Sequence, residues 1–306
     1  CNNYMKIVNV DEGMMNFQTY DFQDNIMNSV MSNRFTICKM PRQSGKTTTM
    51  AALILYFAIF NEAFNIAVLA NKAATAREIL HRIQLAFEHL PSWLQQGIVE
   101  WNKGNIELEN GSKIMAGSTS SGSIRGGSFN LIYLDEFAFV PAQLQEEFFA
   151  STYPTISSGD TTRVMVTSTP KGMNLFYKLW VDAQEGRNEY TPIEVHWSQV
   201  TGRDQAWKEL TVKNTSEDQF RQEFECEFLG SSSTLISPSK LATLVFHDPK
   251  YKNDNVKVFA DPIKDHVYAI SVDTSRGIGN DYSAFTVVDC SVVPYTVVIR
   301  FSYSKS

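Results

Sequence analysis

The chain carries the stretch Pro41-Arg42-Gln43-Ser44-Gly45-Lys46-Thr47, followed directly by Thr48, and this stretch predicts a phosphate-binding loop. It stands between an apolar, strand-like run, Phe35–Met40, and a helix-like run, Thr47–Phe60. A strand, a tight turn and a helix start place backbone N–H groups and the helix dipole against an anion. We therefore expect Lys46 to reach the β- and γ-phosphates of ATP and the Thr47 hydroxyl to ligate Mg²⁺.

One position departs from the usual loop pattern. A glycine normally stands five residues before the second glycine, and this chain has Met40 there. A helix N-terminus that merely carries Lys and Thr in its first turn is the alternative interpretation. The context along the chain has to decide between the two.

An acidic strand end supplies that context. The apolar run Leu131–Leu134 is followed by Asp135 and Glu136, about ninety residues after Lys46. We expect Asp135 to hold Mg²⁺ through its water shell, because Mg²⁺ dehydrates reluctantly. Glu136 would orient and deprotonate the attacking water. The alternative, a strand that ends in a solvated acidic turn, loses weight after a phosphate-binding loop.

Several further residues fit the same chemistry less specifically. Thr167-Ser168-Thr169 ends the next strand-like run and could sense the γ-phosphate and pass its state on. Arg42 could neutralise transition-state charge in cis, and Arg125, on a Gly-rich loop, could do so for a neighbouring subunit. Phe22-Gln23 could stack on adenine and read its edge. Each also has an ordinary interpretation: a common strand end, surface arginines, and a helix that packs on the sheet.

Composition sets broad limits. The 306 residues are 43% hydrophobic and 20% charged, as in a globular chain of about two domains, and the net charge of −6 argues against a generally basic nucleic-acid binder. The four cysteines, far apart and without metal-ligand spacing, fit a reducing, intracellular setting. No apolar run approaches a membrane span, and no signal peptide is recognisable. From Cys1 and the last strand-like run we expect an internal fragment of a longer protein.

Strand-like and helix-like segments alternate along most of the chain. This order predicts an α/β fold with a mainly parallel sheet that is covered by helices on both faces. Asn110-Gly111 predicts a hairpin turn, and a capping box at Ser216 predicts a helix over 216–229 with Phe220, Phe224 and Phe228 in the core. The expected segments are strands at 35–40, 65–70, 105–108, 113–116, 131–134, 163–167 and 192–197, and helices at 47–60, 73–89, 141–150, 174–184 and 216–229. Three β-rich runs follow at 267–272, 284–288 and 295–301.

Taken together, five segments resemble the large terminase subunit of tailed phages, and most of all the contractile-tailed (myovirus) type. They are Arg42–Thr47, Ile98–Gly104, Ile132–Phe139, Thr167–Gly172 and Gln219–Phe224. The absence of the first loop glycine is familiar in that family. The resemblance runs from about residue 18 to the end of the chain.

The resemblance implies the ATPase of a motor that moves double-stranded DNA through the portal into an empty capsid. It implies a P-loop domain of the additional-strand type over 18–230, preceded by a segment 1–17 and followed by a linker, 231–260. By this resemblance, Phe22-Gln23 would recognise adenine, and Arg42 or Arg125 would neutralise the transition-state charge. Glu136 would be the catalytic carboxylate, and Thr167 to Thr169 would form the coupling motif. It also implies a homo-oligomeric ring on the portal, the small terminase subunit as partner, no membrane, and a place in the host cell cytoplasm, docked transiently on the procapsid.

The same resemblance implies that residues 261–306 begin an RNase H-like nuclease. Asp273 and Asp281 match its first acidic positions, and a two-metal nuclease with Mg²⁺ or Mn²⁺ needs several carboxylates. The later ones would fall beyond Ser306, so we expect no nuclease activity from this chain alone. A helicase-like translocase, a transporter-type ATPase and a catalytically silent portal-binding module are the alternatives. The acidic pair argues against the catalytically silent module. The helicase-like translocase lacks support, because no arginine-rich second motor domain is visible in the sequence.

Overall fold

The computed structural model describes residues 2–9, 11–120, 124, 127–157, 160–229, 249–253, 255–274 and 283–303. The chain divides into two compact units, Cys1–Ser239 and Lys240–Ser306. None of the helices in the described part combines the length and the apolar character that a membrane span requires.

An eight-stranded sheet forms the centre of the first unit, in the order β10-β3-β9-β8-β4-β7-β6-β5. The strands from β10 to β7 run parallel to one another, and β6 and β5 add an antiparallel edge. This confirms the expected mainly parallel α/β sheet. The strands are β3 (Phe35–Lys39), β4 (Asn65–Ala70), β5 (Ile98–Trp101), β6 (Asn105–Leu108), β7 (Lys113–Ser118), β8 (Leu131–Asp135), β9 (Arg163–Ser168) and β10 (Thr191–Glu194).

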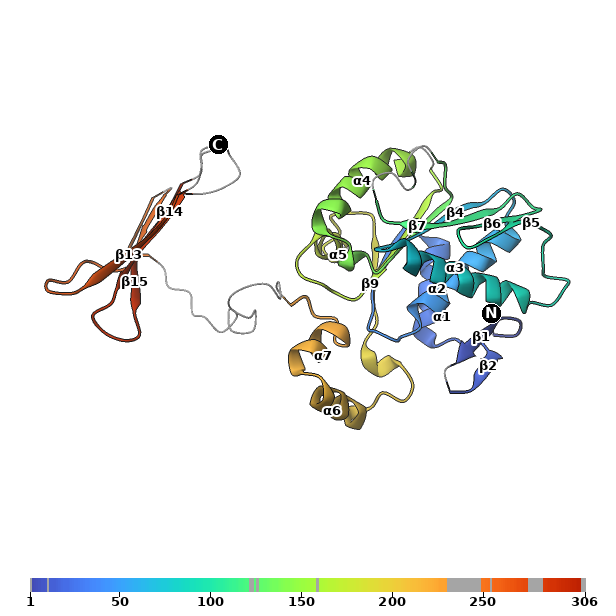
Figure 1. The fold of residues 1–306 in the computed structure, drawn as a ribbon, viewed down its shortest axis with the longest axis horizontal. Coiled ribbons are helices and arrows are strands. Elements are labelled where there is room, and N and C mark those ends of the chain that lie inside the picture. Colours follow the sequence, from blue (N-terminus) through green and yellow to red (C-terminus); the bar gives the residue numbers. More distant parts are fainter. Residues whose placement is uncertain are drawn as a thin grey trace. The chain divides into compact units, whose positions relative to one another are not determined.

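Helices cover both faces of this sheet (Figure 1). Strand β8 shows how: Leu131 and Tyr133 point into the core with α1, α2 and α3, and Ile132 and Leu134 point into the core with α4 and α5. Both sets are buried, which is why the run is apolar throughout instead of alternating. The helices are α1 (Asp21–Ser32), α2 (Lys46–Phe60), α3 (Ala73–Glu88), α4 (Ala142–Ser157) and α5 (Leu175–Gln184).

The end of the first unit differs from the sequence prediction. The expected helix 216–229 is the short α7 (Glu217–Glu223), capped by Ser216 as predicted, and an unpredicted helix α6 (Gln205–Asn214) precedes it. The helix ends at Glu223 with Phe224 as its C-cap, and it could not extend to residue 229, because Cys226 adopts a positive φ of 55°. Phe220 is fully buried between Trp197 and Trp207, but Phe228 lies beyond the helix and packs on Tyr177 of α5.

The second unit contains an antiparallel sheet in the order β11-β12-β15-β14-β13. Its three long strands correspond to the three expected β-rich runs. Val298 is the one buried residue among those described in this unit. The strands are β11 (Tyr251–Lys252), β12 (Val256–Val258), β13 (Tyr268–Asp273), β14 (Ser283–Asp289) and β15 (Thr296–Tyr303). Residues 251–258, which the sequence placed in the linker 231–260, thus contribute two strands, because Val256–Val258 pairs with β15.

A hairpin in the first unit was also not expected from the sequence. Strands β1 (Lys6–Asn9) and β2 (Gly13–Asn16) form an antiparallel hairpin in the predicted segment 1–17, and β1 contacts α3. This contact brings the N-terminal hairpin to the helices α2 and α3, next to the phosphate-binding loop.

Asn110 cross-links the β6–β7 turn to the end of α2. Its Nδ2 donates to the carbonyls of Ala58 and Asn61, each at 2.8 Å, and its Oδ1 accepts from the Ser112 N–H at 3.0 Å. We expect Asn110→Ala to lower the free energy of unfolding by about 1–3 kcal/mol, because it leaves half-buried carbonyls unpaired. Urea unfolding measures this change. Asn25→Ala, at an exposed position of α1, is the control and should stay within about 0.5 kcal/mol of wild type; equal effects would contradict the assignment.

Candidate functional site: a phosphate-binding loop and an acidic strand end

The predicted loop forms between β3 and α2. Gly45 caps the helix in the left-handed conformation, with φ of 78°. A Cβ at this position would lie 2.6 Å from Nε2 of Gln23, so both the backbone angle and the space require glycine. The Ser44 hydroxyl donates to the Pro41 carbonyl at 2.8 Å and closes the turn from its buried side. The loop therefore presents the N-terminus of α2 outward, as an anion site needs.

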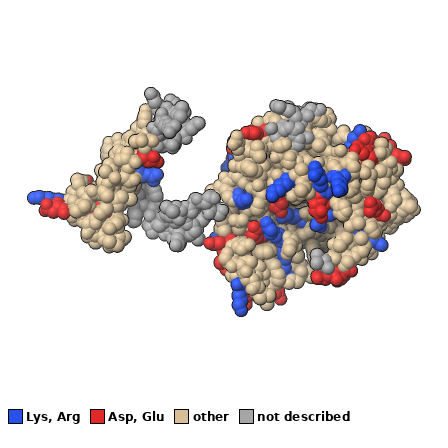
Figure 2. All heavy atoms as spheres, in the orientation of Figure 1, with Lys and Arg blue, Asp and Glu red and all other residues tan. Residues whose placement is uncertain are grey.

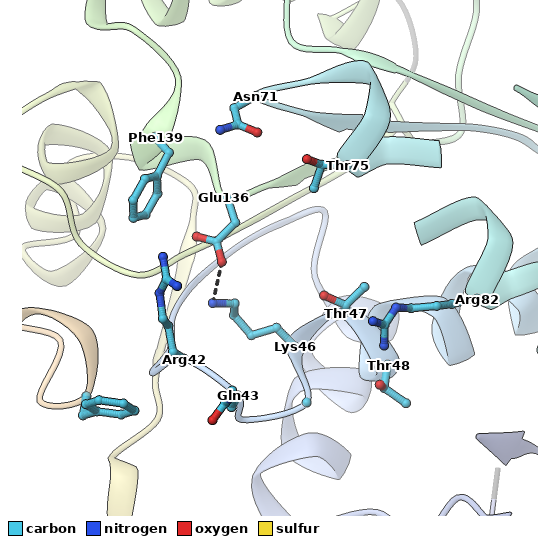
Figure 3. Close-up of a pocket in the computed structure, with 12 residues that line it drawn as sticks. Arg42, Gln43, Lys46, Thr47, Thr48, Asn71, Thr75, Arg82, Glu136 and Phe139 are labelled. Carbon is cyan, nitrogen blue, oxygen red and sulfur yellow. Dashed lines mark ion pairs between the residues drawn. The ribbon is translucent and has the colours of Figure 1, made fainter. Parts of the chain in front are cut away.

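A cavity of about 630 Å³ opens at this helix start (Figure 3). It contains seven of the predicted site residues, and Pro41 and Ser44 lie buried behind them. Its lining residues are Arg42, Gln43, Gly45, Lys46, Thr47, Thr48, Asn71, Thr75, Arg82, Glu136, Phe139 and Phe224. Phe224 was assigned to the core by the sequence, and this was wrong in part, because the end of α7 turns it toward the cavity.

Lys46 and Glu136 meet across the cavity. Lys46 Nζ lies 2.8 Å from Glu136 Oε1, and the lysine side chain is only 7% exposed. Glu136 follows β8 in the left-handed conformation, with φ of 48°, and Figure 3 shows its carboxylate directed toward Lys46. A positive φ in a non-glycine residue is uncommon and occurs often at functional sites. The structure thus brings together the cation and the carboxylate that the sequence predicted.

Asp135 lies deeper than Glu136, at the end of β8. The Tyr133 hydroxyl donates to its Oδ1 at 2.6 Å, and the Thr167 hydroxyl donates to the same atom at 3.2 Å. Burial raises the pKa of Asp135 above its usual range, and the charge of Glu136 adds to the rise, while the hydrogen bond from Tyr133 acts against it. Thr167 stands opposite Asp135 in the pairing of β9 with β8. The acidic pair and the predicted coupling segment are therefore in direct contact.

The other two residues of the coupling segment are buried as well. Ser168 Oγ accepts from the Ala138 N–H at 3.1 Å and lies 3.5 Å from Glu136 Oε2. Thr169 Oγ1 is buried without a hydrogen-bond partner among the described residues. The segment Thr167–Thr169 thus contacts both Asp135 and Glu136. In this geometry a movement of Glu136 can be passed to β9. Its coupling role stays a prediction.

Arg42 is tied to α7. Its Nε lies 2.7 Å from Glu223 Oε2, and its backbone N–H donates to the Glu223 carbonyl at 3.0 Å. The side chain is 57% exposed and extends to the same side of Lys46 as Glu136 and Phe139 (Figure 3). Arg125, the other candidate arginine, lies outside the described residues. Arg42 is therefore the predicted arginine that the structure places at the cavity.

Arg203 is a residue that the sequence analysis missed. Its Nη2 donates to the carbonyls of Arg42 and Gln43, each at 2.9 Å, and its guanidinium lies over the rings of Trp207 and Phe224. Gln43 itself has a positive φ of 53°. Arg203 thus holds a strained turn of the loop from the α6–α7 side. The segment before α6 carries no local signal for this contact, so the sequence alone offered no way to find it.

Arg203→Lys tests this contact. Lysine keeps the charge but lacks the planar fork and the stacking surface. We expect ATP affinity to fall by about tenfold, because hydrogen bonds from a charged group contribute about 1.5–3 kcal/mol and the loop loses its support. Arg187→Lys, at an exposed ion pair with Asp182, is the matched control and should bind ATP like wild type. An unchanged affinity of Arg203→Lys for ATP would show that the loop keeps its shape without the guanidinium of Arg203.

Phe22 and Gln23 lie beneath the loop and outside the lining of the cavity. Phe22 is 4% exposed and stacks on Tyr20, and Gln23 is 1% exposed and accepts the Tyr20 N–H at 2.9 Å. The adenine role of this pair stays a prediction. In the second unit Asp273 is exposed at the end of β13, opposite Ala284 of β14, and Asp281 lies outside the described residues. The nuclease metal site is therefore also a prediction.

With this geometry established, comparison with known proteins identifies the family. A sequence model described as "Terminase large subunit, T4likevirus-type, N-terminal" matches residues 37–243. The chain belongs to this family. The large terminase subunit of Thermus phage G20c is 27% identical over 182 residues, which cover 55% of this chain and 36% of that protein. The chain thus spans about a third of the length of the curated relatives it matches.

Solved structures of large terminases share the fold. A point mutant of the large terminase ATPase domain of Thermus phage P74-26 matches with a TM-score of 0.60 and 18% identity, over 69% of this chain and 95% of that one. The large terminase of a thermophilic bacteriophage, solved in complex with ADP, matches with a TM-score of 0.56 and 13% identity, over 94% of this chain and 69% of that one. The fold is therefore the P-loop fold of large terminase ATPase domains, as expected.

Proposed function

We propose that this chain is the ATP-hydrolysing part of a large terminase subunit, the motor that moves double-stranded DNA into a procapsid. The contact between Lys46 and Glu136, in a cavity formed by a phosphate-binding loop, is the observation that supports it most directly. The family and the ADP complex of a protein with the same fold agree with it. A helicase-like or silent-module interpretation has no comparable support.

The residues present fit a magnesium ion. Mg²⁺ prefers oxygen ligands and keeps several waters, so it needs only one or two protein groups together with substrate phosphates. The Thr47 hydroxyl lines the cavity, and Asp135 lies behind Glu136 with both of its side-chain hydrogen bonds on Oδ1. No group of three or more His, Cys, Asp or Glu side chains in the described residues forms a metal cage, which agrees with such a sparse site. The ion would shield phosphate charge when bound.

In the proposed reaction, water attacks the γ-phosphorus of ATP, and ADP and phosphate are released. Glu136 orients the water and accepts its proton. Lys46 and Arg42 offset the negative charge that spreads over the phosphate oxygens and the leaving group. Thr167 to Thr169 would pass the change at Glu136 to the sheet, and the bonds of Arg42 with Glu223 offer a second route, into α7. Arg125 remains the candidate to act on a neighbouring subunit.

DNA contact would be electrostatic and without base readout. Figure 2 shows Lys and Arg side chains, with a few Asp and Glu between them, gathered around a hollow in one face of the first unit. The net charge of −6 argues against a generally basic surface, so the attraction would depend on a local patch of this kind. Binding to double-stranded DNA should therefore weaken steeply with added salt. The portal, the small terminase subunit, a homo-oligomeric ring, the place in the host cytoplasm and the nuclease of the whole protein are parts of the same proposal.

Phosphate release from ATP tests the proposed function. The chain is assayed with Mg²⁺, with and without double-stranded DNA, and with excess chelator as the blank. We expect Mg²⁺-dependent release that the chelator abolishes. ATP binding without any release, in wild type and in Glu136→Gln alike, would favour a catalytically silent assembly module instead.

A further inference from the structure

The turn that follows the catalytic carboxylate is buried and held by side chains from other segments. Phe137–Phe139 forms one turn of 3₁₀ helix after β8, and Phe137 and Ala138 are almost fully buried. Ser168 Oγ accepts from the Ala138 N–H at 3.1 Å, and Asn174 Nδ2 donates to the Ala138 carbonyl at 2.8 Å. Backbone groups at such depth need partners within the protein, because water does not reach them. Tertiary contacts therefore set the shape of this turn.

Gln145 of α4 makes three hydrogen bonds around the same turn. Its Nε2 donates to the carbonyl of Phe137 at 3.0 Å and to that of Val140 at 2.7 Å. Its Oε1 accepts from the N–H of Leu175 at 3.0 Å. The side chain is 0% exposed, and both N–H groups of its amide are used. A buried amide with this set of partners fixes the backbone segments that it joins.

The two segments that Gln145 joins have different roles in the proposed reaction. One is the turn directly after Glu136. The other is the start of α5, at Leu175, which follows the predicted coupling segment Thr167–Thr169 along the chain. Asn174 caps α5 by accepting from the two N–H groups after that of Leu175, and Gln145 accepts from the N–H of Leu175 itself. One amide thus locks the turn after β8 to the helix after β9.

Glu136 depends on such external support. It has a positive φ of 48°, and a residue in this conformation persists only where the surrounding structure fixes it. Its carboxylate lies 2.8 Å from Lys46 Nζ and 3.5 Å from Ser168 Oγ, and the longer distance is at the limit of a hydrogen bond. In the proposed reaction Lys46 engages the phosphates of ATP and no longer holds the carboxylate. The position of the carboxylate then depends on the backbone of Glu136 and on the turn that follows it.

We propose that Gln145 is a positioning residue for ATP hydrolysis, which holds the turn after β8 and, through it, the carboxylate of Glu136 at the attacking water. The proposal rests on the proposed ATPase function and adds a residue outside the cavity on which the chemical step depends. Gln145 does not line the cavity, so its loss leaves the groups that bind ATP in place. A displacement of a catalytic group by about 1 Å can lower the rate by about a hundredfold.

Gln145→Met removes all three hydrogen bonds and keeps the length of the side chain. We expect single-turnover hydrolysis at saturating ATP to slow by about thirtyfold, with the affinity for ATP within about twofold of wild type. Gln145→Glu is a second variant, which can still accept from Leu175 but, as a carboxylate, cannot donate to the two carbonyls; it should slow hydrolysis by at least about tenfold. Gln143→Met, at an exposed position of α4, is the matched control and should hydrolyse ATP like wild type.

The same substitution in Glu136→Gln separates positioning from a general structural role. If Gln145 acts through Glu136, Gln145→Met should change the residual rate of Glu136→Gln by less than about twofold, because the base is already lost. Phosphate release measures these rates, and isothermal titration measures the affinity for ATP. Together, slower hydrolysis with intact ATP binding in Gln145→Met and no further loss in the double variant would support the proposal.

Three results would overturn the role of Gln145 while the proposed ATPase function stands. The first is a wild-type rate in Gln145→Met. The second is an equal loss of rate in the wild-type and Glu136→Gln backgrounds. The third is a loss of ATP binding in both Gln145→Met and Gln145→Glu, because the residue would then serve the fold alone. Absence of hydrolysis in the wild-type chain would instead overturn the proposed function, and the role of Gln145 with it.

Discussion

Glu136→Gln is expected to lower the rate of ATP hydrolysis by about a thousandfold, because positioned general bases contribute about 10²–10⁴-fold. The amide keeps the size of the side chain but cannot accept the proton of the attacking water. The substitution also removes a negative charge that lies 2.8 Å from Lys46 and faces the incoming γ-phosphate. We therefore expect ATP to bind at least as tightly as in wild type, so the loss is confined to the chemical step.

Single-turnover phosphate release and equilibrium ATP binding, measured on the same protein, check this result. Glu146→Gln, at an exposed position of α4, is the control and should hydrolyse ATP like wild type. If Glu136→Gln kept wild-type turnover, the base would have to be another group. A matched loss of binding and turnover would mean that the residue only holds the loop together.

Lys46→Ala is expected to weaken ATP binding by at least about a hundredfold and to bring hydrolysis to the detection limit. Such a loss corresponds to about 2.7 kcal/mol. The buried ammonium is positioned to donate to phosphate oxygens, and bonds of this charge-assisted kind are about twice as strong as neutral ones. Its removal also leaves Glu136 unpaired, beside Asp135, so that two carboxylates would repel the triphosphate.

A double substitution separates these two contributions. In Lys46→Ala with Glu136→Gln the repulsion from Glu136 is gone, so any recovery of ATP affinity over Lys46→Ala measures that repulsion. We expect a partial recovery, with affinity still well below wild type, because the contact with the phosphates is missing. Full recovery would show that Lys46 acts only by neutralising Glu136 and does not bind the nucleotide.

Local patterns predicted the framework of the site because its parts are contiguous in sequence. The loop from Pro41 to Thr47 and the strand end at Asp135 and Glu136 each combine a buried strand with a turn of special backbone geometry. In a parallel sheet the carboxyl ends of the strands lie at one edge, so the two motifs had to meet there once both strands were parallel. The contact of Lys46 with Glu136 follows from that topology.

The residues that support the site could not be found in the same way. Arg203 reaches the loop from about 160 residues along the chain, and Tyr133 looked like one more apolar position of a buried strand. The predicted helix 216–229 failed because helical spacing of three phenylalanines does not report a backbone break at Cys226. The residues after the break are free to place Phe228 on α5, while Phe224 turns to the cavity.

The sequence by its local motifs predicted the chemistry proposed for this protein, a phosphate-binding turn, an acid for magnesium and a base, since each is a short motif whose backbone geometry depends on adjacent residues. How these groups are held depends on the tertiary structure. Those features depend on contacts between distant segments, such as Arg203 with the loop and the N-terminal hairpin with α3, and the packing that selects such contacts leaves no periodic trace in the sequence.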